Sequence, residues 1–85
     1  MRNIVRIELL GTTGCHLCEV AEKIAKKIAP VLGYGINYVD IASDDALIEQ
    51  YGIRIPVLRL ADQELGWPFD ESQLIQWLEA LPKTK

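Results

Sequence analysis

The sequence predicts an α/β fold with the element order βαβαββα, in which a mixed four-stranded sheet carries helices on both faces. Two observations predict it. Apolar residues change from alternating to helical spacing and back along the chain. Glycine and proline residues that favour turns separate these stretches. The length of 85 residues suits one domain with one modest core, so we expect residues 1–85 to form a single domain.

The first strand and the first helix have the clearest patterns. Apolar and charged side chains alternate over residues 4–10, as in a half-buried strand. After a loop over residues 11–14, apolar spacing becomes helical, so we expect a helix of about four turns from Cys15 to near Pro30. The apolar face of the strand is predicted to comprise Val5, Ile7 and Leu9. The apolar stripe of the helix is predicted to comprise Leu17, Val20, Ala21, Ile24 and Ile28.

A second strand is predicted over residues 36–41, after a turn at residues 33–35. Tyr38 and Val39 favour this strand because aromatic and β-branched side chains fit a pleated surface. A strand–helix–strand unit needs a crossover connection, so the first two strands should be parallel.

A short second helix is predicted to follow, ending at Tyr51. Ser43 is expected as its N-cap, with Asp44 and Asp45 in the first turn, where the helix dipole favours negative charge. Gly52 suits the C′ position that follows the helix.

The last third of the chain predicts two short strands and a final helix. Strands over residues 57–61 and 64–67 are separated by a tight turn, so they should be antiparallel. Asp70 is expected to cap the final helix, with Gln73 as its capping-box partner. Residues 82–85 are expected to be a proline stop and a frayed tail. The buried stripe of the helix is predicted to comprise Leu74, Trp77, Leu78 and Leu81.

Composition and charge exclude several classes of protein. The net charge is −3, which argues against nucleic acid as a partner, and the cluster of Lys23, Lys26 and Lys27 fits a solvated helix face.

No stretch approaches about 20 apolar residues, so we expect no membrane span. No export signal is recognisable, so we expect a cytoplasmic protein. We also expect it to be a monomer. In that reducing compartment, a cysteine pair is more often redox-active or metal-binding than structural.

The cysteine pair lies at the predicted start of the first helix. Helical spacing places the sulfurs of Cys15 and Cys18 on one face, within reach of a disulfide. Unpaired backbone N–H groups at a helix start stabilise a thiolate, so Cys15 is the expected nucleophile and Cys18 the resolving thiol. A protonated His16 would also lower the pKa of Cys15, whereas the carboxylate of Glu19 would disfavour the thiolate. An equally open interpretation is that His16 is simply solvated.

Other interpretations of the pair remain open at this point. A zinc site needs four ligands, and His16 is the only histidine, so we expect no metal within one chain. Both cysteines could instead be small core residues. A retained but unused dithiol, in a protein whose role is binding, is a third alternative.

Three segments carry a resemblance to a known family. Residues 12–18 have the pattern Thr-x-x-Cys-x-Leu-Cys, residues 55–57 are Ile-Pro-Val, and residues 67–70 are Trp-Pro-Phe-Asp. Together with the predicted element order, they resemble the small glutaredoxin-like family of the thioredoxin superfamily. The resemblance covers roughly residues 4–81 and implies a thioredoxin-like fold of glutaredoxin size.

The resemblance also implies a substrate groove. It implies a cis peptide at Ile55–Pro56, with Pro56 beside the dithiol and the backbone of Ile55 free to pair with an extended substrate or with glutathione. No bound cofactor is implied, and glutathione becomes a candidate co-substrate. The expected partners are disulfide-containing proteins or glutathione.

The sequence departs from the family pattern at several places, among them the stretch beside this groove and the first strand. Trp67 and Phe69 occupy the stretch where glutaredoxins carry a glycine pair for glutathione, so this pair is expected to reshape the groove and to be partly exposed near the dithiol. Leu9 stands where thioredoxins bury a proton-accepting acid. The function expected from these patterns is thiol–disulfide exchange, and the alternative is a non-catalytic thioredoxin-fold adaptor.

Overall fold

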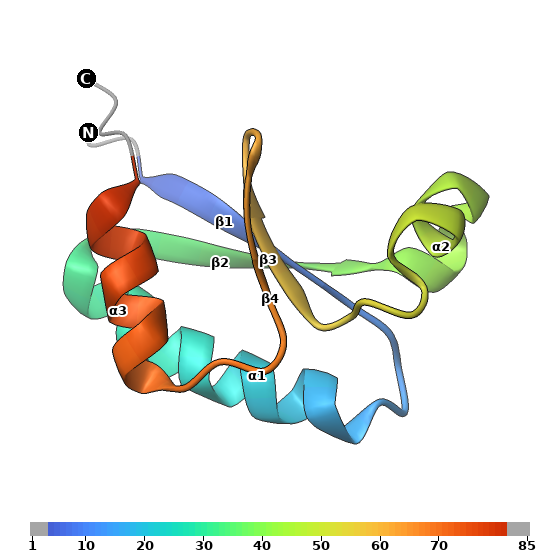
Figure 1. The fold of residues 1–85 in the computed structure, drawn as a ribbon, viewed down its shortest axis with the longest axis horizontal. Coiled ribbons are helices and arrows are strands. Elements are labelled where there is room, and N and C mark those ends of the chain that lie inside the picture. The colour runs from blue at the N-terminus through green and yellow to red at the C-terminus, as the bar shows by residue number, and fades with distance from the viewer. Residues whose placement is uncertain (1–3, 82–85) are drawn as a thin grey trace.

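The computed structural model describes residues 4–81, and Figure 1 shows the fold. The predicted order of strands and helices is confirmed, with two additional 3₁₀ turns labelled η1 and η2. The elements are β1 (Val5–Gly11), α1 (His16–Ile28), η1 (Ala29–Leu32), β2 (Tyr34–Asp40), η2 (Ile41–Ser43), α2 (Asp45–Tyr51), β3 (Val57–Leu60), β4 (Gln63–Gly66) and α3 (Glu71–Ala80).

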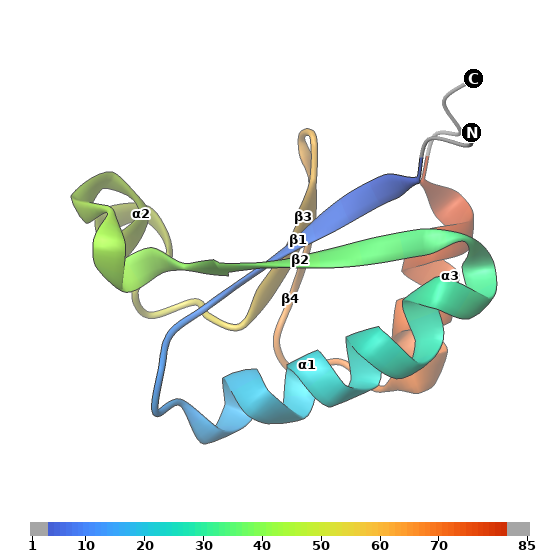
Figure 2. The same cartoon turned by 180° about the vertical axis from the view of Figure 1, so that it is seen from behind.

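The four strands form one mixed sheet in the order β2-β1-β3-β4. β1 and β2 are parallel, and Leu9 lies opposite Tyr38 in their register. β3 is antiparallel to both β1 and β4. Both views of the ribbon show α1 and α3 together along one face of the sheet, with α2 near one end (Figures 1 and 2).

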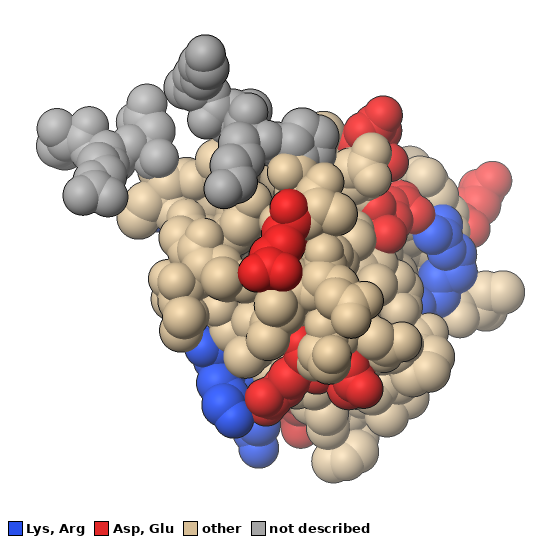
Figure 3. All heavy atoms as spheres, turned by 60° about the vertical axis from the view of Figure 1, so that its left-hand side comes forward, with Lys and Arg blue, Asp and Glu red and all other residues tan. Residues whose placement is uncertain are grey.

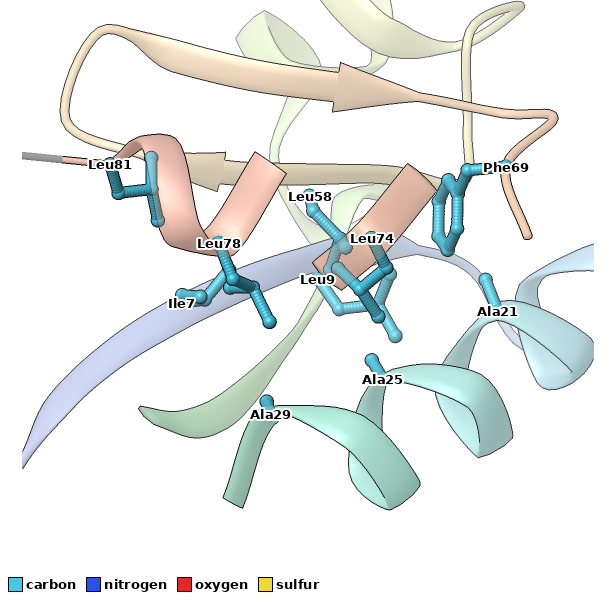
Figure 4. Packing of buried hydrophobic residues seen from close by; sticks show 10 residues of the cluster. All are labelled: Ile7, Leu9, Ala21, Ala25, Ala29, Leu58, Phe69, Leu74, Leu78 and Leu81. Atoms are coloured by element: carbon cyan, nitrogen blue, oxygen red, sulfur yellow. The ribbon is translucent and has the colours of Figure 1, made fainter. Parts of the chain in front are cut away.

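Alternation along the strands divides the core between the two faces of the sheet. Leu9 and Leu58 belong to the larger cluster, which packs against α1 and α3 (Figure 4). Their neighbours Leu10 and Val57 belong to a second cluster with Tyr51 of α2. Because successive side chains of a strand point to opposite faces, helices therefore cover both faces, as predicted.

Several predicted boundaries are wrong by one or two residues. β2 begins at Tyr34 rather than residue 36, because only Gly33 has a left-handed conformation (φ 89°) and Tyr34 already pairs with Val5. Ile41 leaves the strand and begins η2. β3 stops before Ala61, whose φ of 55° turns the chain, so β4 also begins one residue earlier than predicted.

The predicted cap of the second helix is also wrong. Asp44, not Ser43, is the N-cap of α2, and its carboxylate accepts hydrogen bonds from two backbone N–H groups of the first turn. The Ser43 hydroxyl instead donates to the carbonyl of Asp40. Gly52 follows α2 with a right-handed φ of −52°, and the reason for a glycine there is space: a Cβ would lie 2.5 Å from the carbonyl oxygen of Ile48.

The final helix begins as predicted, with a capping box between Asp70 and Gln73. Leu74, Leu78 and Leu81 are buried, and Trp77 packs against the core while half-buried. The predictions for residues 82–85 lie outside the described residues.

A polar cluster on the second face ties α2 to the sheet. The Tyr51 hydroxyl donates a 2.6 Å hydrogen bond to Glu64 of β4, and Arg54 pairs with the same carboxylate. Arg59 of β3 donates to Tyr51 and forms a 2.8 Å ion pair with Glu8 of β1. These contacts hold Tyr51 and Arg54, at the end of α2 and in the segment that leads to Pro56, against β3 and β4.

Acidic and basic side chains both appear on the face shown in Figure 3. Acidic groups lie near its centre, and basic groups lie at two of its edges. The coloured part of this face therefore shows no continuous basic surface of the kind that binds phosphate backbones.

Candidate functional site

The cysteine pair lies at the start of α1, after the loop over residues 11–14. Gly14 has a left-handed conformation (φ 82°) that an L-residue would adopt only under strain, and it turns the chain into the helix. Cys15 is the N-cap, and its sulfur accepts a 3.2 Å hydrogen bond from the backbone N–H of Cys18. The Cys15 sulfur thus occupies the place where Ser or Asp oxygens usually satisfy a helix start.

The two sulfurs differ in environment. Cys15 is half-buried, whereas Cys18 is 1% exposed. Burial raises the pKa of Cys18 to about 11, and the hydrogen bond with the Cys15 thiol adds to this. Both cysteines are free thiols in the structure. Cys15 is therefore the sulfur that a substrate can reach, while Cys18 remains protonated at neutral pH.

Pro56 lies at the same end of the sheet as the dithiol. Leu10 pairs with Val57 in the β1–β3 register, so the next position brings Pro56 opposite Gly11. Gly11 abuts Cys18, because a Cβ at Gly11 would lie 3.1 Å from the Cys18 sulfur. The Ile55–Pro56 peptide bond is cis, and Pro56 is buried.

The backbone of Ile55 is not fully free, contrary to expectation. Its N–H donates a 3.1 Å hydrogen bond to the carbonyl of Tyr51, the last residue of α2. Carbonyl groups at the end of a helix have no partner within the helix, so the chain that follows satisfies one of them here. Because this N–H is already engaged, an extended substrate would have to pair with the carbonyl group of Ile55.

Trp67 is hydrogen-bonded directly to Pro56. Its backbone N–H donates a 3.1 Å hydrogen bond to the carbonyl of Pro56. Its ring meets Phe69 edge to face, with centroids 5.1 Å apart. Trp67 is half-buried, whereas Phe69 is 4% exposed and lies beside Ala21 of α1 in Figure 4. The predicted exposure is therefore wrong for Phe69, which packs in the core and supports Trp67 next to Pro56.

His16 and Leu17, the two residues between the cysteines, are both exposed. His16 is the first residue of α1, and its influence on the dithiol stays a prediction. Leu17 is 46% exposed, so its predicted place in the buried stripe is wrong. The stripe is rotated toward Cys18, Ala21 and Ala25, because the helix turns its small residues toward the sheet.

Tyr38 is a site residue that the sequence pattern presents only as a strand former. A Cβ placed on Gly11 would lie 2.8 Å from the Tyr38 hydroxyl and 3.1 Å from the Cys18 sulfur, so both atoms approach the same face of Gly11. The parallel register that aligns Tyr38 with Leu9 brings it there. Aligning the two predicted parallel strands in this register would have placed Tyr38 near the dithiol from the sequence alone.

Within residues 4–81, no group of three His, Cys, Asp or Glu side chains is arranged to hold a metal ion. The same part of the chain contains no helix that is both long and apolar enough to cross a membrane.

Comparisons with known proteins agree with this geometry. Residues 6–79 match the family described as glutaredoxin-like domain (DUF836). A structural genomics target protein from X. campestris is 38% identical, with a TM-score of 0.79 over 89% of this chain and 99% of that one. No curated protein matches the sequence.

Two more distant structures show the fold alone. Thioredoxin 1 from Thermosipho africanus is 18% identical, with a TM-score of 0.68 over 88% of this chain and 91% of that one. Protein Ne2328 from Nitrosomonas europaea is 22% identical, with a TM-score of 0.73 over 91% of this chain and 94% of that one. The fold is therefore thioredoxin-like.

Proposed function

The chain belongs to the glutaredoxin-like domain family, and from its dithiol geometry we propose that it is a thiol–disulfide oxidoreductase acting through Cys15 and Cys18. The observation that carries the proposal is the asymmetry of the pair. Cys15 is accessible at a helix start and accepts a backbone hydrogen bond, whereas Cys18 is buried with a raised pKa. Cys15 is therefore suited to attack a substrate disulfide, and Cys18 is suited to resolve the mixed disulfide that results.

The reaction proceeds in two exchanges. The thiolate of Cys15 attacks one sulfur of a substrate disulfide, and the other sulfur leaves as a thiolate that takes up a proton. Cys18 then loses its proton and attacks the Cys15 sulfur, which releases the second substrate thiol and leaves a Cys15–Cys18 disulfide. Two electrons pass to the substrate, and an external thiol such as glutathione, or a dithiol reductase, restores the pair.

Substitution of each cysteine tests the order of events. We expect Cys15→Ser to abolish exchange with a disulfide-containing protein, and Cys18→Ser to accumulate a mixed disulfide at Cys15. Mass spectrometry of alkylated protein measures both outcomes, and the double variant is the control for non-specific thiol reactions. Equal activity of the two single variants and the wild type would refute the assignment.

The substrate groove is proposed to lie between the dithiol and the Pro56–Trp67 contact. The Ile55 carbonyl, Pro56 and the partly exposed Trp67 line it, and the partner is a disulfide-containing protein or glutathione in the cytoplasm. Trp67→Ala tests the groove: it should change the apparent affinity for a disulfide substrate while the reaction of Cys15 with a small alkylating reagent is unchanged. An unchanged affinity would remove Trp67 from the groove.

A non-catalytic adaptor is a second candidate, because apolar side chains are exposed near the functional end. Leu17 is 46% exposed between the cysteines, and Ile53 is fully exposed in the segment before Pro56. An adaptor would retain its partner whether the dithiol is reduced or oxidised. Rapid iodoacetamide labelling of Cys15 near neutral pH supports the oxidoreductase, and inert thiols support the adaptor.

A further inference from the structure

Cys18 faces a chemical difficulty in its environment. It is 1% exposed, yet it must become a thiolate to attack the Cys15 sulfur. Burial disfavours the charged form, and a charge formed away from water needs hydrogen-bond donors. The backbone N–H of Thr12 faces the Cys18 sulfur and lowers its pKa, but burial outweighs this contribution.

The Tyr38 hydroxyl is placed to supply a second donor. It and the Cys18 sulfur approach the same face of Gly11, where a Cβ would lie 2.8 Å from one and 3.1 Å from the other. A glycine at position 11 leaves this space open, because a Cβ there would contact both the hydroxyl and the sulfur. Tyr38 projects from β2 on the same face of the sheet as Leu9, its apolar partner in the register.

We propose that Tyr38 is the hydrogen-bond donor that stabilises the Cys18 thiolate when it attacks the mixed disulfide. This inference rests on the proposed function. In the step, the Cys18 S–H proton passes to solvent, the Tyr38 O–H points toward the resulting thiolate, and the thiolate attacks the Cys15 sulfur. The substrate sulfur then leaves as a thiolate that takes a proton from solvent, and Tyr38 keeps its own proton throughout.

Burial and the surrounding negative charges keep the Tyr38 phenol protonated, so that it acts as a hydrogen-bond donor. Glu22 of α1 and Asp40 at the end of β2 are the charged groups that act on the phenol, beside the two cysteine sulfurs. Burial raises the pKa of Tyr38, and the negative charge that Cys18 carries when ionised and these carboxylates raise it further. The phenol therefore stays protonated at neutral pH and offers its hydrogen to an anion.

The test follows the second exchange directly. One equivalent of the aromatic disulfide dithiobis(nitrobenzoate), mixed with the reduced protein, releases one coloured thiol when Cys15 attacks and a second when Cys18 resolves. Stopped-flow absorbance over a range of pH gives the rate of each phase. A hydrogen bond to a charged acceptor changes an equilibrium constant by an order of magnitude, so Tyr38→Phe should slow the second phase about tenfold near pH 8. The pH profile of that phase should shift upward by about one unit, with the first phase unchanged.

Two further variants complete the design. Gly11→Ala adds a methyl group that would contact both the hydroxyl and the sulfur and force them to move, so it should reproduce the slowing and the shift. Tyr34→Phe is the matched control, because Tyr34 lies at the other end of β2, where its hydroxyl donates to the carbonyl of Leu78. This control should leave both phases unchanged.

The outcomes separate this inference from the function on which it rests. A second phase with the same rate and pH profile in Tyr38→Phe and the wild type would overturn the role of Tyr38 and leave the oxidoreductase intact. Slowing without a pH shift would assign Tyr38 a packing role and also overturn the inference. Absence of a second phase in the wild type would overturn the resolving role of Cys18, and the inference with it.

Discussion

Cys18 should react with iodoacetamide far more slowly than an ordinary thiol, and its rate should rise steeply with pH. With a pKa of about 11, about one Cys18 thiol in a thousand is ionised near pH 8, against about one in ten for a thiol with the ordinary pKa of 9.0. Ionisation alone therefore predicts labelling about 100-fold slower, and burial at 1% exposure slows it further. Raising the pH from about 8 to about 10 should accelerate the labelling of Cys18 about 100-fold, but that of the ordinary thiol only about tenfold.

The assay is a timed pulse of iodoacetamide on the fully reduced protein, followed by fragmentation mass spectrometry that locates each adduct. An unstructured peptide containing one cysteine serves as the reference in the same tube. The first adduct near pH 8 should be at Cys15. Labelling of Cys18 within tenfold of the peptide at that pH would show that burial does not hold its proton, and the asymmetry behind the proposed mechanism would fail.

Three further predictions concern the scaffold around the site. Asp70→Ala should lower the free energy of unfolding by about 1 kcal/mol, measured by urea denaturation, with Asp70→Asn losing less because it keeps an acceptor for the cap. The Tyr51 hydroxyl and the neighbouring guanidinium lower the pKa of Glu64, so its stabilisation is present above its ordinary pKa of 4.5 and is lost as pH falls through the lower folded value. Glu64→Gln should therefore show a flatter loss of stability on acidification, and identical acid profiles would contradict this. Gly52→Ala should lower the melting temperature, because its Cβ would meet the backbone oxygen of Ile48, and an unchanged melting temperature would contradict the contact.

Much of the fold could be predicted because its signals are local. The capping box of Asp70 with Gln73 involves groups three residues apart, and the cysteine pair at the start of α1 lies within one helical turn. Short-range geometry of this kind depends on few residues, so a sequence pattern is enough to indicate it. The parallel pairing of β1 and β2 followed from the crossover helix between them.

Errors arose where a local pattern admitted two solutions. Ser43 and Asp44 are both good N-cap residues, and the hydrogen bond from Ser43 to Asp40 decided between them. Leu17 fits a helical apolar stripe by spacing, but the sheet contacts α1 on the side of Cys18 and Ala21. The rotation of a helix about its axis is set by what it packs against, which periodicity alone cannot specify.

The sequence by itself determined the element order, the capping box of the final helix and the dithiol at a helix start, because each depends on residues within a few positions of one another. Only the tertiary structure decided how the dithiol is surrounded. It buried Cys18, engaged the N–H of Ile55 with the end of α2, and brought the Tyr38 hydroxyl to Gly11. These relations depend on strand register and helix packing between distant segments, and a shift of β2 by one residue would turn Tyr38 to the opposite face of the sheet.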